Sequence, residues 1–131
     1  MKHVKDMVAE ANAVVEHRPA SELLDLHGRE DVTFVDLRDP RELERDGMIA
    51  GAFHCRRGML EFWIDPDSPY AKPQFQTGNR FVFYCASGWR SALSARTAQE
   101  MGLANVLHIE DGFKGWQAAG GPVGEKPKKQ E

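Results

Sequence analysis

The chain has 131 residues, with 17 Lys and Arg against 20 Asp and Glu, for a net charge of −3. This length suits one domain with one core, and the acidic balance gives no general attraction to nucleic acid or anionic membranes. No apolar run approaches a membrane span, and the first residues lack the apolar segment of a signal peptide. We therefore expect a cytoplasmic protein with neither nucleic acid nor membrane as a partner.

The chain contains two cysteines, Cys55 and Cys85. Two are too few for a disulfide scaffold or a typical zinc cage. We therefore expect free thiols, with no metal and no cofactor.

The first half of the sequence alternates between helical and strand patterns. An apolar stripe of Val4, Met7, Val8 and Ala11 predicts the first helix. A run of β-branched and aromatic residues at 31–37 is typical of a strand buried on both faces. The predicted order is helix 2–12, strand 13–16, helix 19–28, strand 31–37, helix 39–44, strand 50–55 and helix 58–64.

The second half begins with a loop at 65–79 that holds three prolines and at most one helical turn. It continues with strand 80–84, helix 91–101, strand 105–109 and a last helix that begins at 111–116. Such alternation predicts the α/β class, with a mostly parallel sheet of about five strands covered by helices on both faces. We expect an N-terminal helix at 1–12, one domain at 13–120, and a disordered tail at 121–131 because that tail is rich in Gly, Pro, Lys and Glu.

The segment from Cys85 to Arg90 carries the strongest chemical signal. Cys85 ends an apolar strand, and a short loop containing Gly88 leads from it into a helix. Unpaired amides and the positive end of the helix dipole meet there. This setting favours the nucleophilic thiolate over the thiol, and Arg90 adds a positive charge. The alternative is a buried structural cysteine.

Other polar residues are expected at the same edge of the sheet, because ligands of parallel sheets bind at the carboxyl ends of the strands. Asp36 and Arg38 follow a predicted strand, and Arg57 follows Cys55. Asp36 and Arg38 either orient the loop, bind substrate, or form an ion pair that fixes the next helix, with Glu42 as a candidate partner. Arg57 either attracts anions or is a solvated surface charge.

Several segments together resemble the rhodanese family of sulfurtransferases, and most closely its single-domain bacterial members. Residues 85–91 resemble the active-site loop of that family, 35–38 its Asp-x-Arg segment, 47–52 its Gly-His-Ile-Pro-Gly-Ala segment, and 111–116 the start of its last helix. Met48 and Ala50 replace the usual His and Pro, and Trp89 replaces a smaller residue. The resemblance spans residues 13–120.

The resemblance implies a persulfide mechanism at Cys85. The loop residues that would bind the substrate are Ala86, Ser87, Gly88, Trp89, Arg90 and Ser91. The donor would be a small sulfur anion such as thiosulfate, and the acceptor cyanide, a thiol or a protein thiol. Inward-facing amides would stabilise anionic sulfur, while Ser87 and Ser91 either donate hydrogen bonds or cap the helix.

Two other functions remain open. The first is a phosphatase or arsenate reductase of related fold. Phosphatases of that kind use Cys-x5-Arg loops, whereas the spacing here is Cys-x4-Arg, which suits sulfur better than a phosphoryl group. A persulfide carrier or sensing module with poor thiosulfate turnover would use the same loop.

Three more residues are interpreted from their place in the sequence. Trp89 is expected to be exposed near the mouth of the loop, and Cys55 to be a packed strand residue. His108 is expected to be structural.

Overall fold

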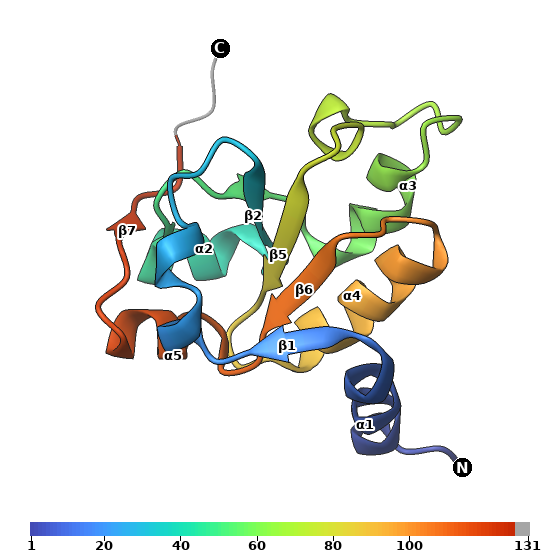
Figure 1. Ribbon diagram of the computed structural model, residues 1–131, viewed down its shortest axis with the longest axis horizontal. Coiled ribbons are helices and arrows are strands. Elements are labelled where there is room, and N and C mark those ends of the chain that lie inside the picture. Colours follow the sequence, from blue (N-terminus) through green and yellow to red (C-terminus); the bar gives the residue numbers. More distant parts are fainter. Residues whose placement is uncertain (128–131) are drawn as a thin grey trace.

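The computed structural model describes residues 1–127, and its centre is a five-stranded parallel sheet in the order β1-β6-β5-β2-β4 (Figure 1). The strands are β1 (Glu16–Arg18), β2 (Val32–Asp36), β4 (Phe53–His54), β5 (Arg80–Tyr84) and β6 (Val106–Ile109). The predicted α/β class and strand number are confirmed. Strand β5 is central and has the predicted bounds, so Cys85 leaves the middle of the sheet at its carboxyl edge.

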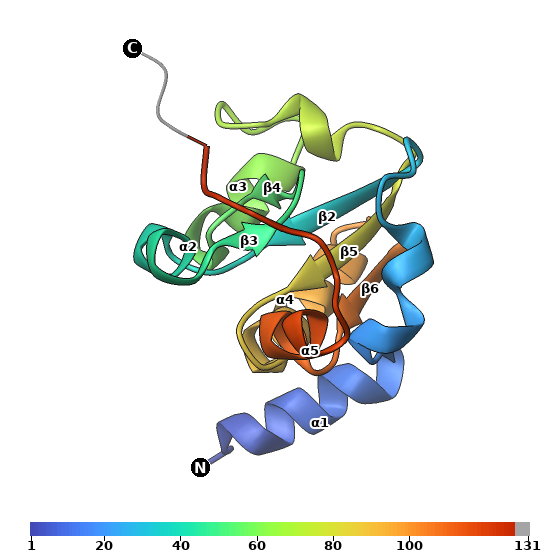
Figure 2. The same cartoon turned by 90° about the vertical axis from the view of Figure 1, so that its left-hand side faces the viewer.

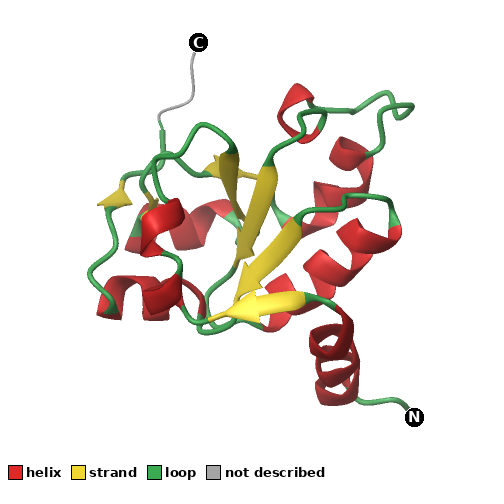
Figure 3. Ribbon diagram, in the orientation of Figure 1, coloured by secondary structure: helices red, strands yellow, loops and turns green. Residues whose placement is uncertain are grey.

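Helices cover both faces of the sheet, as Figure 3 shows. Phe81 and Phe83 of β5 face helices α3 (Leu60–Ile64) and α4 (Trp89–Glu100). Val82 and Tyr84 face the other way, toward α5 (Gly112–Ala118) and the 3-10 turns η1 (Ala20–Glu22) and η2 (Leu24–Leu26). Because successive side chains of a strand alternate between the two faces, the run Arg80–Tyr84 fills both cores.

The N-terminal helix α1 spans Val4–Val14, so it begins and ends two residues later than expected. Its Val8 and Ala11 pack on Ala92 of α4, so α1 lies against the domain along that helix (Figure 2). The predicted strand 13–16 is wrong in position. Strand β1 begins at Glu16 because the polar segment Glu16–Arg18 pairs with β6, a long-range pairing that no local apolar pattern indicates.

The predicted tail is wrong for its first residues. Strand β7 (Val123–Gly124) pairs antiparallel with β3 (Met48–Ile49), and neither strand was expected. The Trp116 indole and the Ala50 amide both donate to the Pro122 carbonyl, at 2.9 and 3.1 Å. These backbone partners order the segment despite its composition. The rest of the expected tail, 128–131, lies outside the described residues.

Several other boundaries differ from expectation. The predicted helix 19–28 is two 3-10 turns, and the predicted strand 50–55 shortens to β4. Helix 58–64 divides into the turn η3 (Arg57–Met59) and α3, and α2 spans Pro40–Asp46. The loop 65–79 holds one helical turn, η4 (Pro73–Phe75), as predicted.

A buried ion pair holds the carboxyl end of β2. Arg38 donates to both carboxylate oxygens of Asp36, at 3.0 and 2.7 Å, and also to the Gly47 carbonyl at 2.8 Å. Both side chains are within 1 % of complete burial. The pair also reaches the neighbouring helix, because the Arg38 guanidinium lies 4.4 Å from the ring centre of Phe113 in α5. The predicted ion pair is therefore present, but its partners are Asp36 and Arg38 themselves, and Glu42 bonds elsewhere.

We predict that Asp36→Ala lowers the free energy of unfolding by about 3–5 kcal/mol, because it leaves the buried Arg38 charge uncompensated. Asp31→Ala is the matched control, since Asp31 makes the same bidentate contact with Arg29 at the surface, where such pairs contribute little. Urea unfolding of both variants tests this. An equal decrease in the free energy of unfolding in the two variants would show that burial does not determine how much this ion pair contributes to stability.

Candidate active site

Cys85 lies at the base of a tight loop between β5 and α4. The residue is 1 % exposed, and the Gly88 amide donates a hydrogen bond to its sulfur at 3.1 Å. We expected Trp89 and Arg90 to lie in the loop. Helix α4 instead begins at Trp89, so both residues belong to its first turn. The sulfur therefore lies beside backbone N–H groups at the positive end of a twelve-residue helix.

Gly88 gives the loop its shape. Its φ is +105°, in the region that side chains disfavour, and a Cβ there would overlap the carbonyl oxygen of Glu110. The backbone can therefore turn its amide toward the sulfur only with glycine at this position.

The first turn of α5 holds the outer side of the loop. The Phe113 amide donates to the Cys85 carbonyl at 2.8 Å, and the Lys114 amide donates to the Ala86 carbonyl at 3.4 Å. Gly112 allows this approach, because a Cβ there would overlap the Ala86 carbonyl. Two loop carbonyls are thus bound away from the sulfur, which leaves the inner side of the loop to N–H donors.

Arg90 points to α2 rather than standing as a free charge over the loop. Its guanidinium donates to both carboxylate oxygens of Glu42, at 2.7 and 3.0 Å. The Arg90 hydrogen bonds, against some loss of hydration, hold the pKa of Glu42 at about 2. The pair therefore stabilises the fold fully above pH 4.5, and this contribution is lost as the pH falls toward 2.

The Ser91 side chain lies beside the Cys85 sulfur. Its Oγ lies 3.6 Å from Cys85 Sγ and 2.9 Å from Nδ1 of His108, a residue that sequence reasoning treated as structural. A histidine directly after two apolar strand residues gives no local signal of this contact. Only the pairing of β6 beside β5 brings His108 to the loop.

The remaining predicted site residues lie around the loop without bonding the sulfur. Trp89 is 51 % exposed at the start of α4, as expected, and Ser87 is also exposed. Arg57 pairs with Glu61 at 2.8 Å in the following helical turn. Among the described residues, neither Arg57 nor the Asp36–Arg38 pair forms a hydrogen bond with 85–91.

Cys55 differs from Cys85 in its surroundings. It is fully buried in the apolar cluster beneath α3 and α4. Burial raises the pKa of its thiol to about 12, against the weaker opposing effect of the nearby arginines. Cys55 therefore remains a protonated packing residue at neutral pH, as expected, although it follows β4 and does not lie in a strand.

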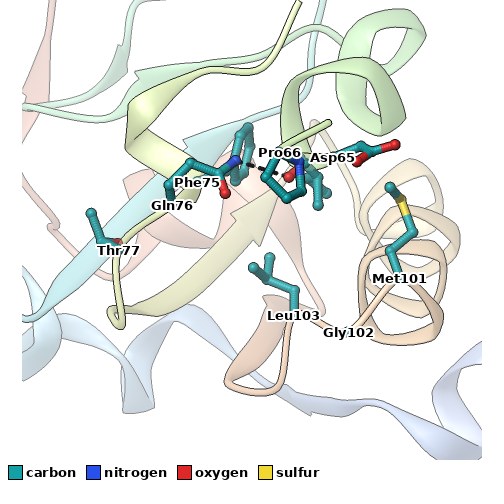
Figure 4. Close-up of a pocket in the computed structure, with 9 residues that line it drawn as sticks. Asp65, Pro66, Phe75, Gln76, Thr77, Met101, Gly102 and Leu103 are labelled. Carbon is teal, nitrogen blue, oxygen red and sulfur yellow. Dashed lines mark hydrogen bonds between the residues drawn. The ribbon is translucent and has the colours of Figure 1, made fainter. Parts of the chain in front are cut away.

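A groove of about 510 Å³ lies far from this loop, beyond the C-terminal end of α4 (Figure 4). Gln76 and Ile64 both line this groove, and the Gln76 amide donates to the Ile64 carbonyl at 2.9 Å. Helix α4 has twelve residues and is about 18 Å long, and the groove lies at its end opposite to Cys85. It is therefore separate from the candidate active site.

Residues 1–127 contain no group of three or more His, Cys, Asp or Glu side chains placed to hold a metal ion. None of the helices in this part of the chain is long and apolar enough to cross a membrane.

Comparison with known proteins places the chain in a family. The model of the rhodanese-like domain matches residues 19–119, so the chain belongs to the rhodanese-like domain family. A dual specificity phosphatase Cdc25 of Arabidopsis thaliana is 32% identical over 113 residues, which are 79% of this chain and 74% of that protein.

Two solved structures extend the comparison. A protein of unknown function from Rhodopseudomonas palustris, described as a possible tyrosine phosphatase, is 58% identical with a TM-score of 0.92, covering 95% of this chain and 96% of that one. The polysulfide-sulfur transferase homodimer from Wolinella succinogenes is 26% identical with a TM-score of 0.68, covering 93% and 87%. Relatives of this fold thus carry descriptions of both sulfur-transfer and phosphatase type.

We predict that Gly88→Ala destabilises the fold more than Gly102→Ala. Both glycines have nearly the same φ, +105° and +106°, so both substitutions incur the backbone cost of about 1–2 kcal/mol. Only Gly88 has a backbone group in the way, since nothing lies within 4 Å of a Cβ at Gly102. Urea unfolding measures the free energy of unfolding of both variants. An equal decrease in the two would mean that the loop moves away from Glu110 at no cost.

Proposed function

We propose that the protein is a sulfurtransferase that carries a sulfane sulfur on Cys85 as a persulfide. The observation that supports this most directly is the loop itself, where the Gly88 amide donates to Sγ while α5 binds the carbonyls of Cys85 and Ala86 on the outer side. A ring of N–H groups stabilises an anionic sulfur without a net positive charge.

The proposed reaction has two displacement steps. The Cys85 thiolate attacks the outer sulfur of thiosulfate, the S–S bond of the donor breaks, and sulfite leaves with the bonding electron pair. The acceptor, which is cyanide, a small thiol or a protein thiol, then attacks the outer sulfur of the persulfide. Cys85 leaves as a thiolate, so the site is regenerated without an oxidant or reductant.

The phosphatase descriptions of two relatives make phosphoryl transfer the second candidate. A loop that binds a phosphoryl group needs a guanidinium fork free to bind two of its oxygens. Here both arms of the Arg90 fork bond Glu42, and the loop spacing is Cys-x4-Arg. These two features favour transfer of a single sulfur atom.

A carrier that passes persulfide to a protein partner would use the same loop. Trp89, at 51 % exposure beside the loop, offers a contact for such a partner. Rapid transfer to a protein thiol with little turnover of thiosulfate and cyanide would favour the carrier over the enzyme.

We predict that Cys85→Ser abolishes thiocyanate formation from thiosulfate and cyanide, while Cys55→Ser retains most of it. The Gly88 amide donates to Cys85 Sγ, whereas Cys55 is a buried thiol with a raised pKa. Steady-state assays of both variants test this, with circular dichroism to confirm folding. Hydrolysis of p-nitrophenyl phosphate without any thiocyanate would instead support the phosphatase.

We predict that Glu42→Gln lowers KM for thiosulfate by about twofold to fivefold at low salt. Loss of the carboxylate leaves the Arg90 charge uncompensated beside the loop, and the substrate is a dianion. The effect should diminish as salt is added.

Glu44→Gln, on the exposed side of the same helix, is the matched control for a change in overall charge. A KM that falls equally in both variants would show that overall charge, and not the Arg90–Glu42 pair, governs attraction of the donor.

A further inference from the structure

A chain of buried hydrogen bonds runs from the nucleophile to the N-terminal helix. Cys85 Sγ lies 3.6 Å from Ser91 Oγ, and Ser91 Oγ lies 2.9 Å from His108 Nδ1. His108 Nε2 lies 2.7 Å from Oδ1 of Asn12, near the end of α1. Ser91 and His108 are 0 % and 1 % exposed, and Asn12 is half-buried at the outer end.

The geometry fixes the direction of these bonds while Cys85 is a thiol. The Asn12 oxygen can only accept, so His108 carries its proton on Nε2 and its Nδ1 is an acceptor. Ser91 therefore donates its hydroxyl proton to Nδ1 and is free to accept the thiol proton. The Cys85 S–H, the Ser91 O–H and the His108 Nε2–H therefore all donate in the direction that leads from Cys85 to Asn12.

That direction is wrong for the thiolate, because an anionic sulfur cannot donate and attracts a donor instead. We propose that the Ser91–His108–Asn12 chain reverses when Cys85 loses its proton, so that Ser91 donates to the thiolate while His108 and Asn12 act as positioning residues. This inference rests on the proposed function of Cys85 as a nucleophile and deepens it.

The proton balance of the reversal is complete. The thiol proton passes to Ser91 Oγ, and the Ser91 hydroxyl proton passes to His108 Nδ1. The Nε2 proton leaves to solvent past Asn12, whose amide turns so that its NH₂ group donates to Nε2. One proton is released, the imidazole is neutral before and after, and the outcome is a change of tautomer.

The charges around His108 favour a neutral ring. Burial, with help from neighbouring His17, lowers the pKa of His108 to about 4, and Glu110 opposes this shift. His17 of β1 lies 5.8 Å away between ring centres and itself bonds Glu110 at 2.9 Å. On the α4 side, the Arg90 charge is paired with Glu42. A lasting imidazolium is therefore disfavoured, and a tautomer change fits the site.

The same chain gives α1 a role in the active site. Helix α1 lies outside the segment that matches the family model, residues 19–119. It nevertheless supplies Asn12, and its Val8 and Ala11 pack on Ala92, the residue that follows Ser91. Packing of α1 on α4 thus holds the outer end of the chain in register with the nucleophile.

Nitrogen-15 NMR of the histidine rings in the full chain tests the reversal without any sulfur donor. As the pH is raised, we expect His108 to change from the Nε2–H to the Nδ1–H tautomer, with the same midpoint as alkylation of Cys85 by iodoacetamide. In Cys85→Ala the ring should stay Nε2–H throughout. A tautomer that does not change while Cys85 titrates, or an imidazolium that forms with the thiolate, would overturn the proposal.

Variants give a second readout. Ser91→Ala should move the midpoint of the alkylation profile upward by about one pH unit, because the thiolate loses a hydrogen bond. His108→Leu should move it in the same direction, and His108→Asn should partly restore it, since an amide can either donate to or accept from Ser91. Ser94→Ala is the matched control, since this buried hydroxyl of α4 donates to the Arg90 carbonyl.

Unchanged midpoints in folded Ser91→Ala and His108→Leu would contradict the proposal. The reversal and the sulfurtransferase function can be refuted independently, because the NMR and alkylation measurements use no sulfur donor. A tautomer change in a protein that makes no thiocyanate would support the reversal of the Ser91–His108–Asn12 chain and refute the sulfurtransferase. Thiocyanate formation without a tautomer change would support the sulfurtransferase and refute the reversal.

Discussion

The hydrogen bond from the Phe113 amide to the Cys85 carbonyl is the contact on which the site depends. It joins the end of the central strand β5 to the first turn of α5 and turns the peptide after Cys85 outward. Phe113 is in turn held beneath the buried Arg38 guanidinium. The ion pair at the end of β2, the placement of α5 and the shape of the loop are therefore parts of one arrangement.

In the proposed mechanism, dipoles stabilise the anionic sulfur more than net charge does. Arg90 is neutralised by Glu42, while the Gly88 amide donates to Sγ at the start of α4. Fixed dipoles would need no reorganisation as charge moves between the proposed thiolate and persulfide. On this proposal the site accepts sulfur donors of different charge, and the Arg90–Glu42 pair sets how strongly a dianion is preferred.

The sequence was most informative where local signals agree. The apolar run Arg80–Tyr84 predicted strand β5, and Gly88 predicted the turn after Cys85. The role of Cys85 as nucleophile stays a prediction. Strand β1 was misplaced because Glu16–Arg18 is polar, and β3 and β7 were missed because each has two residues and forms only by mutual pairing. Bonds between distant segments, such as Arg90 to Glu42 and His108 to Asn12, have no local signature in the sequence.

The most direct measurement of the central claim is the mass of the folded protein after treatment with thiosulfate. We expect a gain of one sulfur atom, mapped by peptide analysis to Cys85 and not to Cys55, and removed by cyanide. Protein unfolded before the treatment should gain nothing, because the amides surround the sulfur only in the assembled loop. A folded protein that gains no sulfur, or gains it on Cys55, would contradict the account.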